Sequence, residues 1–492
     1  MREMTNVRVR YAPSPTGIPH IGNIRTAMFD WLYARHTGGT FIVRIEDTDK
    51  NREVEGGIDL QLDALRWYGL DWDEGPGVGG AYGPYIQSER LHFYQKYADE
   101  LIAAGKAYRA YDSEERLKSM REEQQKRGLP TGYDRRHRYL TDEERAEYEK
   151  SGAPSVVRFA VPTEGKTTYV DAVYGEIAFE NRVLDDAILL KSDGYPTYHL
   201  ASVVDDHLME ITHVLRGEDW IPSSPLHVQL YRAFGWDAPT FVHLPNMMGP
   251  DGKKFGKRNG AKDAMEYGQE GYLVEAMFNF MSLQGWSPKE ERDLFSREEL
   301  VERFSLEGIL NRSPITDPVK LDWFNGQYIR SMSLHDLAER CLPFLQKAGF
   351  AEENPSAETL EYIGRVLALE QERIKTLAEA PILGGFFLQA DDAYEFDEKA
   401  VAKWFSNPGV GDRLRAVKED FAALKDFDAA SVEAVVRDVI ARFEVKGGEV
   451  IHPVRVSVSG RTTGPGLFEM IEVLGRERVL RRLDRALSLV TA

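Results

Sequence analysis

A loop rich in proline and glycine, residues 13–23, constrains the fold of this chain more than any other stretch. It follows an alternating segment at residues 7–11, which predicts a strand, and it precedes a helical pattern over residues 24–36. A second strand is predicted at residues 40–45. A strand, a glycine loop, a helix and a strand in this order open a βαβ unit, which requires a parallel sheet.

The same loop has the chemistry of a phosphate site. Open parallel sheets bind ligands beyond the carboxyl ends of their strands. Pro13 and Pro15 stiffen the loop, while Gly17 and Gly22 let its backbone approach a phosphate. The next helix offers free N–H groups and a positive dipole end, and His20 can donate to a phosphate oxygen as charge develops there. A proline-rich turn with a surface histidine is the alternative, and the ten-residue context favours the phosphate site.

A second loop, residues 249–261, is rich in glycine and lysine. Its run Lys-Lys-Phe-Gly-Lys-Arg at residues 253–258 includes Lys254 and Lys257. Mobile lysines can clamp a triphosphate and neutralise the charge that develops on pyrophosphate. By itself, such a loop is more often an exposed basic turn.

A third set of residues stands at predicted strand ends: Arg10, Glu46 and Arg216, with Tyr198 nearby in the pattern. Side chains at these ends can converge on one ligand. A carboxylate and two guanidiniums suit a ligand with an amine and carboxylates, because arginine binds carboxylate bidentately. From spacing alone, buried ion pairs at the sheet edge are the favoured alternative.

The 492 residues exceed what one compact core holds, so several domains are expected. A charged helical region follows residue 85, and strands are predicted at 156–161, 167–170 and 177–181. The α/β pattern then resumes with strand-like segments at 187–191, 198–204, 211–216 and 240–244 and a helix at 225–234. Beyond residue 266 the patterns are helical, including 334–347, 357–379, 412–424, 431–443 and 467–489.

These patterns predict an α/β Rossmann-type catalytic domain with an α+β insertion, followed by all-α C-terminal domains. The catalytic domain is expected at residues 1–85 and 199–248, split by an insertion at 86–198. A helical domain that starts with the second loop is expected at 249–335. Two further helical subdomains are expected at 336–395 and 396–492.

Composition narrows the class of protein. One cysteine, Cys341, excludes an internal disulfide and a zinc site built from several cysteines. We find no apolar run long enough to span a membrane and no signal peptide, so a cytoplasmic location is expected.

The net charge of −18 argues against a nucleic-acid partner, but the balance is local. Residues 116–138 carry eight Lys/Arg against three Asp/Glu, and residues 476–485 carry five arginines against two acidic residues. Binding a phosphate backbone needs only a local positive surface. A solvated helix face with ion pairs explains either run about as well.

Several motifs now carry a resemblance to a known family. They occur in the family's order at residues 13–17, 20–22, 25–27, 41–49, 193–201, 214–220, 253–258 and 463–469. Together they closely resemble bacterial glutamyl-tRNA synthetases of class I. The resemblance spans nearly the whole chain, which makes it far more specific than any one loop.

The resemblance implies roles at matching positions. His20, Lys254 and Lys257 would be catalytic, with the two lysines stabilising the transition state. Arg216 would read the side-chain carboxylate of glutamate, within a glutamate site of Arg10, Ser14, Glu46, Tyr198 and Arg216. An ATP site would comprise Ser14, Gly17, His20, Gly22, Asp219, Trp220, Met247, Lys254 and Lys257.

The resemblance also implies partners: L-glutamate, ATP with Mg²⁺, and tRNA(Glu), bound by a monomer. The insertion would hold the acceptor end of the tRNA and the helical C-terminal region would read the anticodon. Arg373 matches a family arginine near the last anticodon base, although an exposed helix arginine is nearly as good an interpretation.

Three departures from the family pattern stand out. Asn23 replaces the second histidine of the first signature, as is common in glutamyl members. Gly256 replaces the usual serine of the second signature, which loosens that loop. The insertion lacks the cysteines that bind zinc in some members, so no zinc is expected.

Two rival hypotheses remain open at this stage. One is an enzyme of the same superfamily that adenylates a small metabolite and never meets tRNA; the long helical C-terminal region argues against it. The other is a non-catalytic tRNA-binding paralogue. The presence of His20, Lys254 and Lys257 argues against it, and Gly256 is the one feature in its favour.

Overall fold

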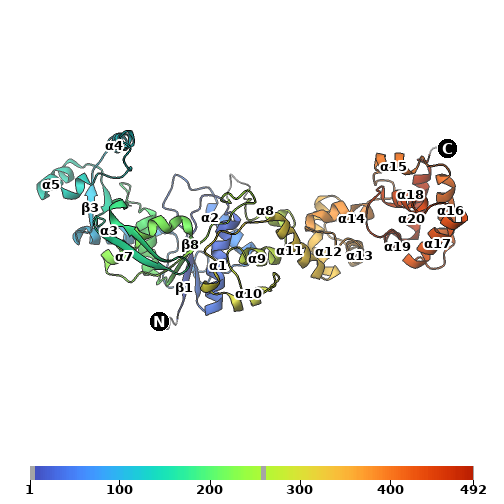
Figure 1. Cartoon of the computed structure of the whole chain (residues 1–492), viewed down its shortest axis with the longest axis horizontal. Helices are drawn as coiled ribbons and strands as arrows, with labels where there is room; N and C mark the ends of the chain where they lie inside the picture. The colour runs from blue at the N-terminus through green and yellow to red at the C-terminus, as the bar shows by residue number, and fades with distance from the viewer. Residues whose placement is uncertain (1–5, 256–261, 491–492) are drawn as a thin grey trace. The chain divides into compact units, whose positions relative to one another are not determined.

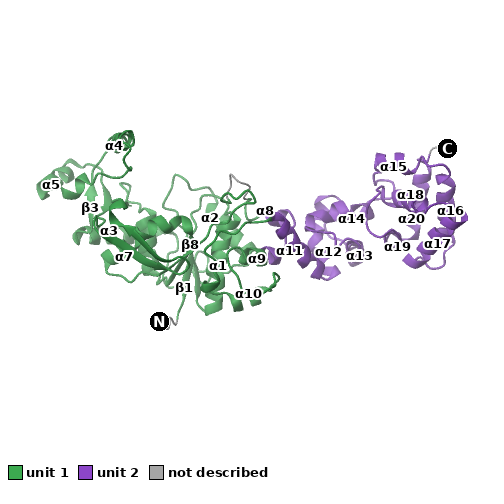
Figure 2. Ribbon diagram, in the orientation of Figure 1, with its two compact units in different colours: residues 1–266, 278–317 green, residues 267–277, 318–492 purple. Residues whose placement is uncertain are grey.

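The computed structural model describes residues 6–255 and 262–490 (Figure 1). Two compact units divide the chain: residues 1–266 with 278–317, and residues 267–277 with 318–492 (Figure 2). The predicted loop residues Gly256 and Lys257 lie outside the described residues.

The predicted parallel pairing is present in the first unit, where two parallel pairs of strands belong to two adjacent sheets. Strand β1 (Arg8–Tyr11) pairs in parallel with β2 (Thr40–Val43), with Arg8 opposite Thr40. Strand β8 (His213–Gly217) pairs in parallel with β9 (Thr240–Leu244). The N–H of Thr212 donates to the carbonyl of Arg8 at 2.9 Å, so β8 starts beside β1. The carboxyl ends of these strands therefore meet at one edge.

Two strands from the expected insertion join the sheet of β8 and β9. Strand β5 (Lys166–Asp171) pairs in parallel with β9, and β6 (Gly175–Glu180) pairs antiparallel with β5. The expected boundaries of an insertion at residues 86–198 therefore cut through the sheet. The rest of that segment has a separate sheet of β3 (Ala107–Ala110), β4 (Val156–Phe159) and β7 (Ile188–Leu190) with helices α4 (Glu114–Lys126) and α5 (Asp142–Ser151).

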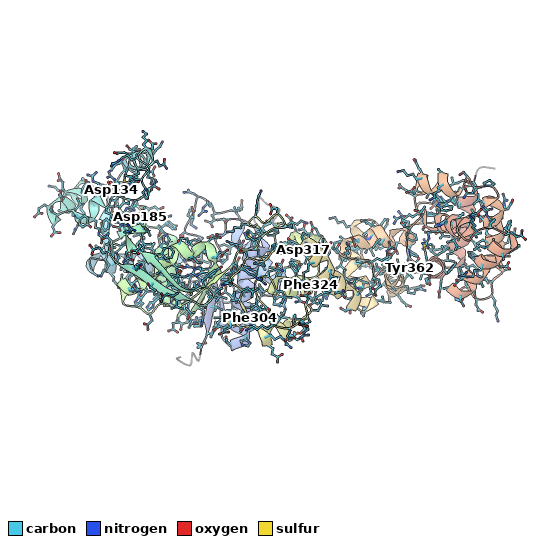
Figure 3. All side chains as sticks on the ribbon, viewed as in Figure 1. Asp134, Asp185, Phe304, Asp317, Phe324 and Tyr362 are labelled. Carbon is cyan, nitrogen blue, oxygen red and sulfur yellow. The ribbon has the colours of Figure 1, made fainter. Side chains whose placement is uncertain are left out.

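The basic run at 116–138 lies in this part, and internal ion pairs occupy several of its cations. Arg116 pairs with Asp112 and Asp134, and Arg135 and Arg138 pair with Asp186. Figure 3 labels Asp134 there. For these three arginines, the interpretation as ion-paired residues is the one that the structure supports.

Helices flank the main sheet. Helix α1 packs against β1, β2 and β8, and α7 packs against β5. The strand predicted at 198–204 is wrong, because that segment lies in α6, which packs on α3 and α7 and buries Leu200, Ala201 and Val204. The bounds of the helices in this unit are α1 Ile21–Thr37, α2 Gly57–Trp67, α3 Leu91–Ala103, α6 Tyr198–Leu208, α7 Ser224–Phe234 and α10 Arg297–Arg303.

The described residues of the second unit form helices joined by loops and include no strand. Its helices are α11 Pro318–Ser331, α12 Leu334–Lys347, α13 Ala357–Ala368, α14 Ala380–Leu388, α15 Glu398–Trp404, α16 Val410–Ala423, α17 Ala429–Arg442, α18 Gly448–Ser459, α19 Leu467–Leu474 and α20 Arg476–Leu487. Two short helices, α8 Glu266–Gln269 and α9 Val274–Ser282, occur where the chain passes between the units. The predicted order, an α/β domain with an α+β insertion followed by all-helical domains, is confirmed.

Two predicted helices are each broken. The helix expected at 467–489 divides at Gly475, whose φ of +81° ends α19. The helix expected at 357–379 stops after α13, because the next turn serves a tertiary contact. There, Gln371 Nε2 donates to the carbonyls of Ile329 at 2.9 Å and Met332 at 3.1 Å, at the end of α11.

The arginine run at 476–485 has a structural role in this unit. Arg482 is fully buried and donates to the carbonyls of Val458 at 2.6 Å and Phe386 at 2.8 Å. Arg478 donates to the carbonyl of Gln389 at 2.6 Å, and both arginines pair with Asp391. These guanidiniums satisfy carbonyls at the ends of α14 and α18, so neither is available for a phosphate.

None of the described helices combines the length and the apolar character needed to cross a membrane.

Candidate active site

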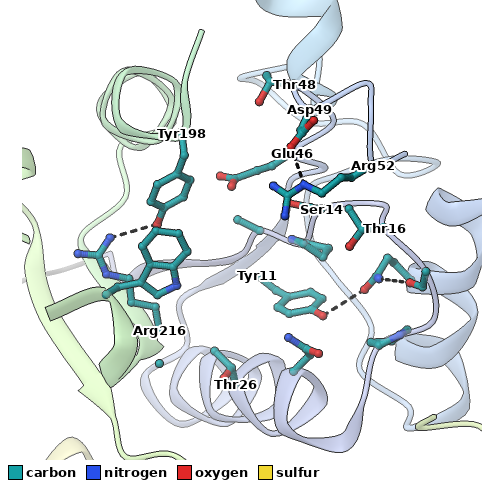
Figure 4. Close-up of a pocket in the computed structure, with 18 of the residues that line it drawn as sticks. Tyr11, Ser14, Thr16, Thr26, Glu46, Thr48, Asp49, Arg52, Tyr198 and Arg216 are labelled. Carbon is teal, nitrogen blue, oxygen red and sulfur yellow. Dashed lines mark hydrogen bonds and ion pairs between the residues drawn. The ribbon is translucent and has the colours of Figure 1, made fainter. Parts of the chain in front are cut away.

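A cavity of about 1220 Å³ opens at the carboxyl ends of β1 and β8 (Figure 4). Its walls come from the first loop, the segment after β2, the start of α6 and the end of β8. Nine of the predicted site residues line it: Arg10, Ser14, Gly17, His20, Glu46, Tyr198, Arg216, Trp220 and Lys254. Residues from distant parts of the sequence thus share one cavity.

Other predicted site residues do not line this cavity. Gly22, Asp219 and Met247 are absent from its walls, and Met247 is buried, with only 4% of its surface exposed. Arg373 belongs to the second unit. Lys257 lies outside the described residues, so its assignment stays a prediction.

His20 is the N-cap of helix α1. Its Nδ1 accepts from the N–H of Asn23 at 3.3 Å, and Asn23 Oδ1 accepts from the N–H of His20 at 3.3 Å. Asn23, the departure from the two-histidine signature, therefore completes a capping box. Because Nδ1 accepts, a neutral ring carries its proton on Nε2.

The two glycines of the first loop have different structural roles. Gly17 has a φ of +126°, a conformation that side chains with a Cβ rarely adopt. At Gly22 a Cβ would lie 2.9 Å from Cε1 of His20, so glycine here makes room for the capping ring. Gln61 of α2 anchors the loop, since its Nε2 donates to the carbonyl of Gly17 at 2.7 Å.

Arg216 is buried and held by several partners. Its Nε donates to His243 Nε2 at 3.1 Å, its Nη1 to Tyr198 Oη at 3.1 Å, and its Nη2 to Ser224 Oγ at 2.8 Å. The ring of Tyr198 lies against that of Trp220, with centroids 4.2 Å apart. Figure 4 shows Tyr198 and Arg216 on one wall and Glu46 facing them from another. The guanidinium is therefore fixed before a ligand arrives.

A buried cluster of charges lies behind the opposite wall. Asp206 Oδ1 accepts from Arg10 Nε at 3.0 Å and from Arg44 Nη1 at 2.8 Å. Arg44 Nη2 also donates to Glu46 Oε1 at 3.1 Å. Burial alone would raise the pKa of Asp206, but Arg10 and Arg44 outweigh it and lower that pKa. Burial raises the pKa of Glu46, and the same two arginines oppose the shift.

Removing the shared carboxylate of this cluster is expected to destabilise the first unit. Asp206→Ala leaves the guanidiniums of Arg10 and Arg44 buried without that partner, which costs about 3–5 kcal/mol in comparable sites. Urea unfolding that follows the transition of the first unit measures the loss. Asp63→Ala removes an exposed ion pair with Arg66 on α2 and is the control, with little change expected. Equal effects of the two substitutions would contradict this account.

Lys254 reaches the cavity from the second loop. Its Nζ pairs with a carboxylate oxygen of Asp219, and Asn246 Nδ2 donates to the other oxygen at 3.1 Å. Burial acts to raise the pKa of Asp219, but its hydrogen bonds to Lys254 and Asn246 lower it. Asp219 itself does not line the cavity, but it holds Lys254 at the rim.

Sequence reasoning missed two cations of the site. Arg52 and Lys191 both line the cavity; Arg52 Nε pairs with Asp49 Oδ2 at 2.6 Å, and Lys191 Nζ donates to the carbonyl of Thr48 at 3.0 Å. They flank motifs that were recognised, at 41–49 and 193–201. Their spacing from those motifs is the one signal that could have found them.

The chemistry of the cavity follows from these contacts. One wall presents a fixed guanidinium, another a carboxylate, and the first and second loops present a histidine and a lysine. Such a site suits a small amphoteric acid beside a polyanion. Among the described residues, no group of three or more His, Cys, Asp or Glu side chains is arranged to hold a metal ion.

Known proteins match this chain along nearly its whole length. The family model described as "tRNA synthetases class I (E and Q), catalytic domain" matches residues 6–323, and the one described as "Anticodon binding domain" matches residues 336–487. The glutamate–tRNA ligase of Dehalococcoides mccartyi is 49% identical over 99% of both chains. That of Thermus thermophilus is 44% identical and covers 98% of this chain and 100% of its own.

A solved structure is similar too. It is the crystal structure of a glutamate tRNA ligase from Elizabethkingia meningosepticum in complex with its amino acid. It matches with a TM-score of 0.90 at 35% identity and covers 99% of this chain and 100% of that chain. The likeness therefore extends over both compact units.

Proposed function

This chain belongs to the glutamate–tRNA ligase family of class I tRNA synthetases, and on that premise we propose that it activates L-glutamate with ATP and transfers it to tRNA(Glu). One observation carries the proposal: the buried Arg216 shares a single cavity with His20 and Lys254. A carboxylate reader and two phosphate-directed groups are what the reaction requires.

The reaction has two steps in this site. A carboxylate oxygen of glutamate attacks the α-phosphorus of ATP, the bond to pyrophosphate breaks, and glutamyl-adenylate forms. A hydroxyl of the terminal ribose of tRNA then attacks the acyl carbon, releasing AMP and a proton. No covalent enzyme intermediate is needed, because positioning and charge stabilisation lower the barrier.

Glutamate is held by its charges. The guanidinium of Arg216 pairs with the side-chain carboxylate, and Tyr198, whose oxygen already accepts from Arg216, can donate its hydroxyl proton to the same group. Glu46 receives the ammonium group, while Arg10 and Ser14 complete the pocket. Glutamine would leave Arg216 without a charged partner, which is costly in a buried site.

ATP lies along the first loop and helix α1. Nε2 of His20 donates to a phosphate oxygen, and Gly17 shapes the approach of the backbone. Lys254 and Lys257 neutralise the departing pyrophosphate, so Lys254 exchanges its partner Asp219 for phosphate when ATP binds. Magnesium enters with ATP as part of the substrate, and we propose no resident zinc.

The tRNA contacts both units. We assign the acceptor end to the segment 86–198 and the anticodon to the helical region after residue 336. Arg373 is half-exposed and its Nη1 donates to the buried Glu370 at 2.7 Å. We assign it to an anticodon base on the family resemblance alone. A cytoplasmic monomer completes the proposal.

Pyrophosphate exchange tests this function. The purified chain is assayed with glutamate or glutamine, with and without tRNA(Glu) and tRNA(Gln), followed by charging of each tRNA. Glutamate-dependent exchange and charging of tRNA(Glu) are the expected results. Exchange with glutamate but no charging of any tRNA would favour an enzyme that adenylates small molecules. No exchange under any condition would favour a non-catalytic tRNA-binding protein.

A further inference from the structure

Arg216 is supported from behind by a buried pair that touches no part of the cavity, Asp171 at the end of β5 and His243 on β9. We propose that Asp171 fixes the tautomer of His243 and that His243 thereby aims Arg216, so that this pair is a positioning device for selecting glutamate over glutamine. The inference rests on the proposed function, because it assumes that Arg216 reads the side-chain carboxylate.

The carboxylate of Asp171 acts as an acceptor on both oxygens. Oδ2 accepts from His243 Nδ1 at 2.6 Å and from the N–H of His243 at 3.2 Å. Oδ1 accepts from the N–H groups of Val173 at 2.9 Å and Tyr174 at 3.0 Å. The side chains of Asp171 and His243 are both fully buried. This environment locks the carboxylate against the imidazole.

That contact decides which ring nitrogen of His243 carries the proton. Facing a carboxylate acceptor, Nδ1 must be the N–H, and in a neutral ring Nε2 then has a lone pair. Burial lowers the pKa of His243, which favours the neutral ring. Nε2 can therefore accept the Nε–H of Arg216 at 3.1 Å. In the other tautomer Nε2 of His243 would carry the proton, and its N–H would face the Nε–H of Arg216.

The bond at Nε fixes more than one atom of Arg216. The guanidinium is planar, so holding Nε and Nη2 orients the whole fork. Nη2 donates to Ser224 Oγ at 2.8 Å, and Nη1 is shared between Tyr198 at 3.1 Å and His227 Nδ1 at 3.2 Å. A guanidinium that reads a carboxylate must be held in this way, since a loosely aimed one discriminates less between a carboxylate and an amide.

Asp171→Asn is the direct test, because it keeps the shape of the side chain. The NH₂ of the asparagine then faces Nδ1 of His243, which makes Nδ1 the acceptor. The ring proton moves to Nε2, where it faces the Nε–H of Arg216. We expect kcat/KM for glutamate to fall on the order of 10- to 100-fold, the loss seen when the hydrogen-bond partners that orient metal-binding side chains are removed. The ratio of kcat/KM for glutamate to that for glutamine falls with it, while KM for ATP is unchanged. Pyrophosphate exchange in the presence of tRNA(Glu) gives all these values.

Two substitutions of His243 cover the case in which Asp171→Asn does not fold. His243→Gln keeps an acceptor for Arg216 and His243→Leu removes it. We expect the glutamine variant to retain a glutamate-to-glutamine ratio closer to that of the original chain. Equal ratios for the two variants, or ratios unchanged from the original, would overturn the proposal.

A second buried Asp–His pair provides the matched control. Asp112 Oδ2 lies 2.9 Å from His137 Nδ1, and both side chains are at most 3% exposed, but neither lines the cavity. Asp112→Asn should leave the glutamate-to-glutamine ratio unchanged. A similar fall in that ratio would mean that any loss of a buried pair has this effect, which refutes a specific role for Asp171.

Arg216→Gln separates this inference from the proposed function. If that variant uses glutamate normally, the assignment of Arg216 is wrong and the proposed site fails. If Arg216→Gln lowers kcat/KM for glutamate while Asp171→Asn and His243→Leu behave like the original chain, the site stands and the positioning pair is rejected.

Discussion

Replacing Arg216 by glutamine is expected to lower kcat/KM for glutamate on the order of 10³- to 10⁴-fold, because a buried polar site then lacks its charged partner. KM for ATP should change little, since His20 and Lys254, which we assign to ATP, come from other segments of the wall. Glutamate-dependent pyrophosphate exchange, measured over a range of each substrate, separates the two effects.

Arg232→Gln is the matched control for this experiment. Arg232 is an exposed residue of α7 whose Nη2 donates to the carbonyl of Thr168 at 3.0 Å, and it does not line the cavity. The same loss of charge there should leave kcat/KM for glutamate near its original value. If kcat/KM for glutamate falls equally in both variants, the change in net charge explains the result and the carboxylate contact does not.

Substituting the lysines of the second loop is the other change with a large expected effect. Lys254→Ala and Lys257→Ala should each slow adenylate formation on the order of 10²- to 10³-fold, the cost of one donor to a developing negative charge. Affinity for tRNA should change little, because we assign these lysines to pyrophosphate and not to tRNA. Single-turnover formation of glutamyl-adenylate and a tRNA-binding assay measure the two quantities.

The neighbouring Lys253 is the natural control in that series. It is exposed, its N–H donates to Asp251 Oδ1 at 3.0 Å, and its side chain does not reach the cavity wall. Lys253→Ala should form adenylate at nearly the original rate. A parallel loss of tRNA affinity and adenylate formation in Lys254→Ala would remove the catalytic role assigned to that lysine.

The sheet and its site were predictable where local patterns coincide with strand ends. Alternation at β1 and the glycine loop that follows gave the position of Arg10, Gly17 and His20 from fewer than twenty neighbouring residues. Glu46 and Arg216 were singled out by their places at predicted strand ends, with Tyr198 nearby in the pattern, and the family resemblance added their role in holding glutamate. All of these line the one cavity at the carboxyl ends of the strands.

Residues that act through long-range contacts were not predictable. Asp171 and His243 are 72 residues apart, and their contact depends on the pairing of β5 with β9, which no local sequence pattern predicts. Arg44 and Asp206, 162 residues apart, pair for the same kind of reason. The segment at 198–204 was misjudged because a short apolar run fits a strand and a buried helix equally well.

The order of the strands also governs how this protein forms on the ribosome. Arg8 and Thr212, which join β1 to the start of β8, are separated by 204 residues. At typical synthesis rates that interval lasts roughly 10 to 40 seconds. Throughout it the edge of β1 that β8 will cover has no strand beside it, and such an edge can pair with another chain. Slow translation between β2 and β8 therefore lengthens the period in which the nascent chain is exposed to aggregation, and the wall of the cavity that holds Arg216 forms only after β8 has emerged.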